Sequence, residues 1–569
     1  MIKDFIQAAR GEIRADLVLR GGRVVNVFSA EILETDVAVF RGQIVGIGSG
    51  YQAEEEVDLH GLYLCPGFID SHVHIESSMV EVPQFARAVV PLGTTSVVAD
   101  PHEIANVLGY EGIRFMMDSS KYNPLDVFFM LPSCVPATPL ETAGSELRAF
   151  DIFPILRERW VLGLAEMMNY PGVLACDPDV LDKLKIVSDK RIDGHAPGLT
   201  GRDLNAYVAA GIQSDHECTT VEEAREKLQK GMTVMIREGS GARNLLSLLP
   251  LVRTDNERRF LFCTDDRHPN EILREGHINY MVRTAIRSGI PPIAAIRMAT
   301  LNPAEYFGLH QHGAIAPGRK ADLVVFDDPQ TVQVRRVYKA GQLVALDGAA
   351  VYEVPARPPT SLRSSMNLRW LEGDEFTIPA RGRQCRVIGL IPDQIATESL
   401  VMECPRENGN LVTDTRRDIV RLYVLERHRA SDRIGYGLVH GFGMQKGAMA
   451  SSISHDSHNV IALGVSDADL RKAVTALQKM GGGIVVVRDG TVLESLELPI
   501  AGLMSNRPLE YVSAKSRDLI QAARSLGIGI DDPLMTLSFL ALPVIPKLKL
   551  TDRGLVDVDR FTYVDLFLE

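Results

Sequence analysis

Between residues 62 and 266, short apolar runs typical of β-strands alternate with stretches of helical pattern. One such stretch, TTVEEAREKLQKG, has Thr220 and Glu223 in the spacing of a capping box and ends at Gly231. Regular β/α alternation predicts a parallel sheet, and eight units favour a (β/α)₈ barrel whose site lies at the C-terminal ends of the strands. The eight strand-like runs are LYLCPGFID, TTSVVAD, DVFFMLP, WVLGLAE, RIDGHA, GIQSDHE, MTVMIRE and RRFLFCTDD.

Residues able to bind a metal ion fall at the ends of five of these runs. Successive side chains on a strand point to opposite faces, so His72 and His74 share one face, which would be the barrel interior. Taken singly, a histidine at the end of a buried strand is more often packed or hydrogen-bonded than metal-bound. Several such residues at the ends of strands in one barrel instead favour a metal site built from imidazoles and carboxylates. The candidates are His72, His74, Glu166, His195, His216 and Asp265.

Antiparallel β texture flanks the barrel segment on both sides. β-Branched runs broken by glycines, such as ADLVLRGGRVVNVF, occur near the N-terminus and return in GAIAPGRKADLVVFDD. We therefore expect one composite β domain, built from residues 1–61 and 311–360, around a barrel of residues 62–310. After the proline-rich VPARPPTSLRSS, residues 361–569 mix strand-like and helical runs and are expected to form a C-terminal α+β domain.

Composition limits the partners and the cellular compartment. The net charge of −12 and the pI near 5.7 argue against a polyanion-binding surface, so we expect no nucleic-acid partner. The seven cysteines are scattered without a CxxC pair, as in reduced proteins. The charged N-terminus lacks the apolar core of a signal peptide, and the chain has no apolar run of the roughly 18 residues that a membrane span requires. We expect a cytoplasmic homo-oligomer without a membrane partner.

PGFIDSHVHIESS is followed in order by the acid of run four, two further strand-end histidines and the aspartate of run eight, and this series resembles the amidohydrolase superfamily. Within it, DSHVHIESSM, VVADPHEIANVLG, AEMMNYPGV, DGHAPGL, FCTDDRHP and SISHDSHN are similar to the bacterial adenine deaminases, over almost the entire chain. The resemblance implies a metal-dependent (β/α)₈ hydrolase barrel with a composite β-sandwich and an adenine-deaminase-type C-terminal domain. It also implies hydrolytic deamination of adenine to hypoxanthine and ammonia, by a metal-activated hydroxide, in purine salvage.

The resemblance assigns roles to the six candidate ligands. Mixed imidazole and carboxylate ligands without thiolate permit Mn²⁺, Fe²⁺ or Zn²⁺, and the resemblance favours manganese or iron. Asp265 is the implied proton shuttle between the attacking water and the departing ammonia, and His216, which could instead polarise the water, is the alternative. The implied binuclear centre has Glu166 as a bridge, one ion on His72, His74 and Asp265, and the other on His195 and His216.

Protonation of ring nitrogen N1 needs a further acid, for which Glu217 and Glu103 are both candidates. A solvated or ion-paired glutamate is the alternative role for each, and on a regular strand Glu217 would point away from the site. Glu76, just past the metal histidines, could support them or contact the substrate. In the C-terminal region, SISHDSHN brings His455 and Asp456 together, either as a polar turn or as a segment that reaches the barrel mouth and contacts substrate.

Two other functions remain open from the sequence. One is another amidohydrolase reaction, on a different purine or on a cyclic amide. The other is a non-catalytic scaffold on an amidohydrolase-like barrel, which the complete set of candidate ligands disfavours. A shared fold does not by itself identify a substrate, so the choice among the enzymatic reactions rests on the resemblance.

Overall fold

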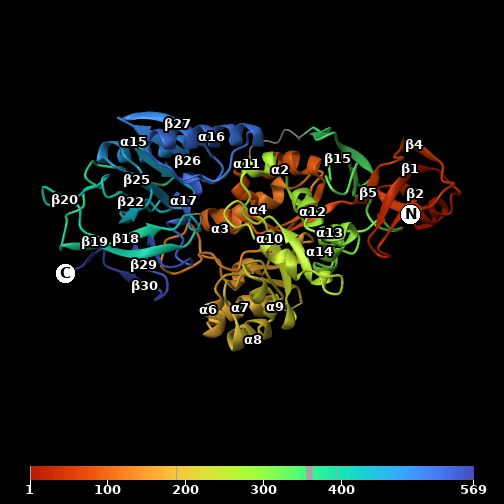
Figure 1. Ribbon diagram of the computed structural model, residues 1–569, viewed down its shortest axis with the longest axis horizontal. Coiled ribbons are helices and arrows are strands. Elements are labelled where there is room, and N and C mark those ends of the chain that lie inside the picture. Colours follow the sequence, from red (N-terminus) through yellow and green to blue (C-terminus); the bar gives the residue numbers. More distant parts are fainter. Residues whose placement is uncertain (1, 188, 354–361, 363, 393, 569) are drawn as a thin grey trace.

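The computed structural model describes residues 2–568, except residues 188, 354–361, 363 and 393. A central region of parallel strands and helices lies between an N-terminal β layer at one end of the molecule and a large C-terminal region at the other (Figure 1). The predicted boundary between residues 360 and 361 lies outside the described residues.

Each of the eight predicted runs contains a strand of the central region. Five strands form one parallel sheet, and three more form a second parallel sheet. Backbone hydrogen bonds link the two sheets, from Asp265 N to His72 O at 2.9 Å and from Gln213 N to Ile192 O at 3.0 Å. The strands are β6 (Phe68–Val73), β7 (Thr94–Ala99), β8 (Asp126–Leu131), β9 (Val161–Met167), β10 (Arg191–Gly194), β11 (Ser214–Asp215), β12 (Thr233–Arg237) and β13 (Phe260–Cys263).

The first predicted run is divided between two sheets. Its first half forms β5 (Tyr63–Pro66), which pairs with strands of the N-terminal layer, and its second half forms β6. Gly67 separates the halves, where the chain passes so close to its neighbour that an added Cβ would lie 2.1 Å from Thr95 Oγ1. The single long strand predicted for residues 62–70 is therefore wrong, because the chain leaves one sheet and enters another at this glycine.

Side chains that alternate along the parallel strands pack below the site. A strand sends every second residue to the same face, and several strands contribute to one buried apolar cluster. Members of this cluster are Ile69, Val98, Met130, Ala165, Met235 and Leu261. Above this packed layer, the polar residues that follow the strands form the floor of the site, and most of them are buried.

Helices connect the strands and cover them from outside (Figure 1). Helix α9 (Val221–Gln229) begins as predicted after Thr220, whose hydroxyl oxygen accepts a hydrogen bond from Glu223 N at 3.3 Å. The other helices of the region are α2 (Val82–Val89), α3 (His102–Leu108), α4 (Tyr110–Ser119), α5 (Ala149–Ile152), α6 (Tyr170–Leu174), α7 (Pro178–Ile186), α8 (Gly201–Ala209), α10 (Leu245–Leu248), α11 (Pro269–Arg274), α12 (Ile278–Arg287), α13 (Pro292–Met298) and α14 (Leu301–Tyr306).

The N-terminal layer is a nine-stranded sheet drawn from two distant parts of the chain. Strand β5 lies between β1 and β14, with Val324 paired to Cys65. Helix α1 (Ile2–Ala9) packs beside β3. The strands are β1 (Ala15–Asn26), β2 (Glu31–Phe40), β3 (Gln43–Ile47), β4 (Ala53–Asp58), β5, β14 (Leu323–Phe326), β15 (Val334–Lys339), β16 (Gln342–Leu346) and β17 (Ala349–Ala350).

The C-terminal region contains a second nine-stranded sheet and a small three-stranded one. The predicted helical run DADLRKAVTALQKM forms α15 (Asp467–Met480), and α16 (Leu509–Ser525) and α17 (Pro533–Phe539) follow. The large sheet comprises β18 (Gln384–Leu390), β19 (Thr397–Glu403), β22 (Ile419–Leu425), β23 (Ile434–His440), β24 (Ala448–Ser451), β25 (Val460–Gly464), β26 (Gly483–Arg488), β27 (Thr491–Glu497) and β31 (Phe567–Leu568). The small sheet comprises β28 (Leu548–Thr551), β29 (Gly554–Asp557) and β30 (Thr562–Val564), and β20 (Arg406–Glu407) pairs with β21 (Asn410–Leu411).

Direct hydrogen bonds hold the C-terminal region against the central one. Ser505 N donates to Met79 O at 2.8 Å, and Glu81 N donates to Ser505 O at 3.0 Å. On another side, Thr142 N donates to Asp552 Oδ1 at 2.9 Å. Among the described residues, no helix combines the length and the apolar character needed to cross a membrane.

Candidate metal centre

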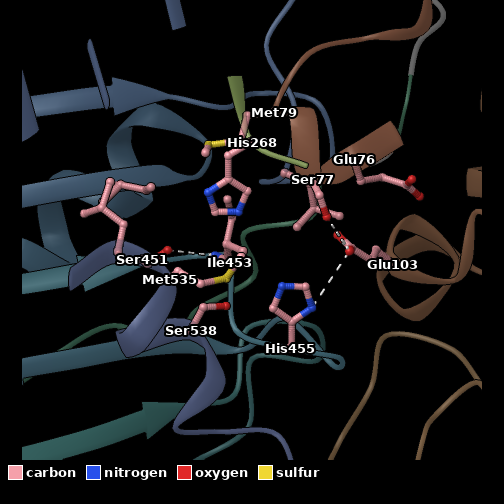
Figure 2. A pocket seen from close by; sticks show the side chains of 13 residues that line it. Glu76, Ser77, Met79, Glu103, His268, Ser451, Ile453, His455, Met535 and Ser538 are labelled. Atoms are coloured by element: carbon pink, nitrogen blue, oxygen red, sulfur yellow. Dashed lines mark hydrogen bonds and ion pairs between the residues drawn. The ribbon is translucent and has the colours of Figure 1, made fainter. Parts of the chain in front are cut away.

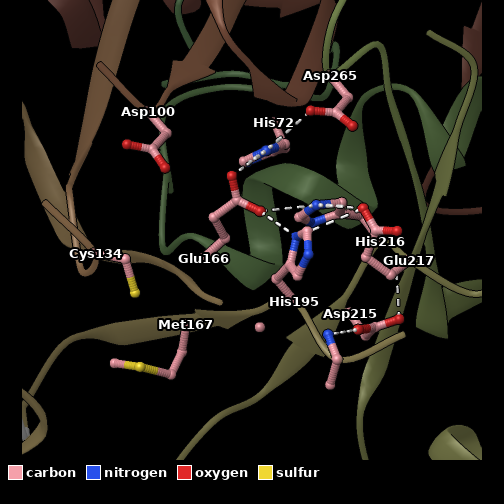
Figure 3. Close-up of polar contacts among 12 residues, drawn as sticks. His72, Asp100, Cys134, Glu166, Met167, His195, Asp215, His216, Glu217 and Asp265 are labelled. Carbon is pink, nitrogen blue, oxygen red and sulfur yellow. Dashed lines mark hydrogen bonds and ion pairs between the residues drawn. The ribbon is translucent and has the colours of Figure 1, made fainter. Parts of the chain in front are cut away.

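Glu166, at the C-terminal end of β9, lies among the imidazoles of His72, His195 and His216 (Figure 3), and His74 completes two pairs. Its Oε2 lies 2.6 Å from His195 Nδ1 and 3.1 Å from His216 Nε2. Its Oε1 lies 3.3 Å from His74 Nε2 and 3.9 Å from His72 Nε2. Each carboxylate oxygen therefore faces a different pair of histidines, as a ligand shared by two cations would.

Asp265 completes one side of this cluster. Its Oδ1 lies 3.0 Å from His74 Nε2 and 3.5 Å from His72 Nε2. The residue follows β13 in a left-handed conformation, with φ of +55°, and its backbone pairs with the segment that carries the two histidines. The strand order thus brings the first and last of the eight strands together at the site, and with them three candidate ligands.

The donor atoms of this cluster fit a metal cation. His74 Nδ1 lies 3.0 Å from the carbonyl oxygen of Asp100, which only accepts hydrogen bonds, so Nδ1 carries the hydrogen of a neutral ring. The lone pair on His74 Nε2 then faces the carboxylate oxygens of Glu166 and Asp265 and lies 3.1 Å from His72 Nε2. Hydrogen-bond acceptors that face one another at these distances need a cation between them, and imidazole with carboxylate is a common ligand set for divalent metals.

Burial and the opposite charges act against each other in this cluster. Burial raises the pKa of Glu166, but His195 and His216 outweigh it and hold that pKa well below its usual range. Burial likewise lowers the pKa of His216, but Glu166 outweighs it and raises the pKa to about 9. The site therefore favours ionised carboxylates with positive charge close to them.

Arg237, at the end of β12, is a site residue that the sequence analysis missed. Its Nη1 and Nη2 donate to the two carboxylate oxygens of Glu217, and its Nη1 also donates to Asp265 Oδ2 at 2.7 Å. The arginine in the seventh run, MTVMIRE, was the available signal, since it is a charged residue at the C-terminal end of a barrel strand. Strand β11 ends at Asp215, so strand alternation does not apply to Glu217, which lines the cavity.

The cluster forms one wall of a cavity, and the C-terminal region forms the other. Glu103, His455 and Asp456 from the sequence predictions line this cavity, as does His102, whose Nδ1 lies 3.6 Å from Glu166 Oε1. The opposite wall is apolar, and no pattern in the sequence indicated it. Its side chains include Ile395, Met535, Phe539, Leu542, Val544 and Ile545.

Glu76 lies outside this cavity. It lines an adjoining one, together with Ser77, Glu103 and His455 (Figure 2). Its Oε1 accepts a hydrogen bond from Ile104 N at 3.2 Å, and it is buried. The structure thus brings Glu103 and His455 to both cavities, whereas the predicted contact of Glu76 with substrate has no support from its position.

The SISHDSHN segment is a buried loop between β24 and β25. Arg427, itself fully buried, holds the loop by donating to the carbonyl oxygens of His458 and, at 3.4 Å, Ser452. The His455 ring stacks on Phe539, with ring centroids 4.7 Å apart and planes 8° apart. Of the two interpretations of this motif, burial and these contacts favour a segment that reaches the barrel mouth over a solvated turn.

Comparison with known proteins gives concordant matches for both halves of the chain. Residues 63–344 match the amidohydrolase family, and residues 394–562 match the adenine deaminase C-terminal domain. The chain is 52% identical to an adenine deaminase of Desulfatibacillum aliphaticivorans and 50% identical to adenine deaminase 2 of Carboxydothermus hydrogenoformans, with 100% of each chain covered in both cases. Among solved structures, dihydropyrimidinase from Brevibacillus agri aligns with a TM-score of 0.46 at 17% identity, over 59% of this chain and 96% of that one.

Proposed function

The chain belongs to the adenine deaminase family of amidohydrolases, and from this membership we propose the residues with which it converts adenine and water to hypoxanthine and ammonia. The observation that carries the assignment is the position of Glu166, whose two carboxylate oxygens face different histidine pairs. A binuclear metal centre accounts for this arrangement. Adenine is the small-molecule substrate.

Six side chains would hold the two ions. The ligand set of imidazoles and carboxylates without thiolate permits Mn²⁺, Fe²⁺ or Zn²⁺, and the resemblance to adenine deaminases favours Mn²⁺ or Fe²⁺. When bound, the ions would act as Lewis acids and lower the pKa of a water molecule to near neutrality. Glu166 would bridge, His72, His74 and Asp265 would hold one ion, and His195 and His216 would hold the other.

Asp265 is the proposed proton shuttle. Its Oδ1 faces the histidines, while its Oδ2 accepts a hydrogen bond from Arg237, which fixes the carboxylate in one orientation. From there it can accept a proton from the attacking water and pass it to the departing amino nitrogen. His216, on the other side of Glu166, is the alternative group for activating the water.

The apolar wall supports a flat aromatic substrate. Met535, Phe539 and Leu542 face the polar cluster across the cavity, so a purine held between them would lose its contact with water. Exclusion of water strengthens the electrostatic interactions that the reaction uses. His455 and Asp456 lie at the polar edge of this wall and are the proposed purine contacts from the C-terminal region.

We propose a division of the chain into three domains that follows the sheets except at β5 (Tyr63–Pro66), which lies within the barrel range but pairs with the N-terminal layer. The eight parallel strands would close into a (β/α)₈ barrel over residues 62–310, and residues 1–61 with 311–360 would form the composite β-sandwich. Residues 361–569 would form the C-terminal domain. A cytoplasmic location, a homo-oligomeric state and the lack of nucleic-acid or membrane partners stay predictions from the sequence.

A substrate panel tests the function. Purified protein reconstituted with Mn²⁺ would be assayed against adenine, adenosine, guanine and cytosine, with ammonia and the purine product both measured. We expect ammonia and hypoxanthine in equal amounts from adenine, and little turnover of the others. Preferred turnover of another substrate, or no ammonia from adenine at a full complement of metal, would reject the proposal.

A further inference from the structure

Deamination of adenine requires a proton at ring nitrogen N1, in addition to the one that leaves with ammonia. Besides the proposed metal ligand Glu166, two glutamates line the reaction cavity and could supply this proton, Glu217 and Glu103. Arg237 donates to both carboxylate oxygens of Glu217. This bidentate pairing engages both carboxylate oxygens of Glu217 and turns them toward the guanidinium, so neither is free to meet a ring nitrogen.

Glu103, in the first turn of α3, has different surroundings. It is buried, and among the described residues no lysine or arginine forms an ion pair with it. Ser77 Oγ lies 3.0 Å from Glu103 Oε1 and 2.5 Å from Asp266 Oδ1. The hydroxyl has one hydrogen and cannot donate to both, but a protonated Glu103 that donates to Ser77 Oγ satisfies both contacts.

Two histidines of the C-terminal region approach the same carboxyl group. His455 Nδ1 lies 3.8 Å from Glu103 Oε1, and His458 Nε2 lies 3.8 Å from Glu103 Oε2. Figure 2 shows the Glu103 side chain with dashed contacts to Ser77 and to His455. Glu103 thus lies where the central and C-terminal regions meet, at the edge of both cavities.

His458 is suited to orient Glu103 rather than to bind a metal ion with it. Its Nδ1 accepts a hydrogen bond from Ser454 N at 3.3 Å, so the neutral ring carries its hydrogen on Nε2. That Nε2 is buried without a hydrogen-bond partner and faces Glu103. His455 is held in turn by its stacking on Phe539.

We propose that Glu103 is the acid that protonates N1 of adenine, and that His455 and His458 of the C-terminal region position its carboxyl group. This inference rests on the proposed function. It gives the C-terminal region a direct part in the reaction, because without that region Glu103 would face solvent instead of two histidines. Glu103 is the catalytic residue; His458 acts through it, and so does His455, in addition to its proposed contact with the purine.

The proton balance of the reaction is complete with these groups. As the water oxygen bonds to C6, Asp265 takes one of its protons, and the C6–N1 π electrons take the proton of Glu103. Asp265 then protonates the amino group, the C6–N bond breaks and ammonia leaves. The remaining hydroxyl proton is lost as the C6 carbonyl forms, and a proton returned through water restores the Glu103 acid.

The groups around Glu103 each move its pKa in a definite direction. Burial raises the pKa of Glu103, His455 opposes this, and Asp266 adds to it. Burial raises the pKa of the neighbouring Glu76 to about 8, with a contribution from Glu103. His74, His102 and His458 also face this group. Since the donor must carry its proton, kcat/KM should fall as pH rises through the pKa of Glu103, and loss of the His455 charge should move that fall to higher pH.

The test compares the pH profiles of variants. Glu103→Gln, His455→Gln and wild type would be measured for kcat/KM on adenine and for metal content, with His440→Gln, on β23 of the same region, as the control. Glu103→Gln should keep its metal, lose about 100-fold or more in kcat/KM, the scale of a missing general acid, and lose the basic limb. His455→Gln should retain more activity, with the basic limb moved to higher pH. His440→Gln should match wild type.

Three results would overturn the assignment of Glu103 as the proton donor. One is a Glu103→Gln enzyme that keeps more than a tenth of wild-type kcat/KM with an unchanged profile. Another is loss of activity in step with loss of metal, which would place Glu103 in the metal site. The third is an unmoved basic limb in His455→Gln. A wild type that releases no ammonia from adenine would reject the proposed function and the proton donor with it, whereas an active wild type confines any failure to Glu103.

Discussion

Arg237 donates hydrogen bonds to both carboxylate oxygens of Glu217 from the end of β12. The same guanidinium reaches Asp265 Oδ2 at 2.7 Å, so one cation pairs with two buried carboxylates. Burial lowers the pKa of Arg237, but these two acids outweigh it and raise that pKa further above its usual range. The pairing fixes the orientation of a proposed metal ligand and engages both carboxylate oxygens of Glu217.

Replacement of Arg237 by Gln should destabilise the protein. The change removes the guanidinium that pairs with Glu217 and Asp265 and leaves only histidines beside these buried acids, and loss of one partner of a buried ion pair typically costs about 3–5 kcal/mol in the free energy of unfolding. Urea denaturation of the metal-free protein measures this loss of stability. Bound metal ions would otherwise supply positive charge in place of the guanidinium. Arg253→Gln, which breaks an exposed pair with Asp255, is the matched control. A stability equal to that of the control would show that Arg237 does not neutralise these acids.

Replacement of Glu166 by Gln should remove metal. The amide keeps the shape of the side chain but lacks the negative charge that faces two histidine pairs. We expect about one metal ion per chain or fewer, and a loss of at least roughly a hundredfold in kcat, the scale of an impaired Lewis-acid contribution. Elemental analysis alongside adenine turnover decides this, with the exposed Glu158→Gln as control. Two ions and a near-normal rate in Glu166→Gln would refute the bridge.

The apolar wall should exclude nucleosides. If C6 of the purine faces the metal cluster, the opposite edge of the ring, which carries ribose in adenosine, faces Leu542 and Ile545. Wild type should therefore use free adenine far better than adenosine. Leu542→Ala with Ile545→Ala should raise the ratio of kcat/KM for adenosine to that for adenine, by about tenfold for one or two removed contacts. An unchanged ratio would mean that specificity lies elsewhere.

Lys549 should make stability depend on pH. Its Nζ donates to Ile395 O and Phe539 O at 2.8 and 2.9 Å, and burial lowers its pKa to about 7. Between that value and the normal 10.5, the unfolded chain binds more protons than the folded one, so stability rises with pH. The contribution approaches 1.36 kcal/mol per pH unit for one proton.

The Lys549→Met variant isolates this contribution. Urea unfolding of both proteins between about pH 7 and 10 gives the slope for each, and the wild-type slope should be the steeper. The two lost hydrogen bonds shift the variant's stability by a constant amount and leave the comparison of slopes intact. Parallel curves would show that Lys549 is charged in the folded protein.

The meeting of the candidate ligands was predictable because each of them follows the C-terminal end of a predicted parallel strand. Parallel strands place their carboxyl ends at one edge, so His72, Glu166 and Asp265 could be expected to meet although they are far apart in the sequence. The split of the first run at Gly67 was not predictable, because an apolar run carries no mark of the sheet it joins. Both halves of that run are almost wholly buried, which removes the alternation that would distinguish them.

The apolar wall of the cavity could not be predicted from the sequence, for a different reason. Met535 and Phe539 belong to a helix with apolar residues on most of its faces, a pattern that also describes ordinary core helices. Only the packing of the C-terminal region against the central one shows that these residues face the candidate metal ligands, of which His72 is the first in the sequence. The SISHDSHN motif was visible in the sequence, but the carboxyl group that His455 and His458 approach was not.

The position of β5 between β1 and β14 has a consequence for synthesis on the ribosome. Chains emerge N-terminus first, at about 5–20 residues per second, and domains usually fold as they emerge. Here β5 has no partner on its second side until residues 323–326 have left the exit tunnel, after the whole central region has been made. An open strand edge pairs readily with other chains, so the nascent N-terminal layer stays exposed to such pairing at β5 throughout synthesis of the central region.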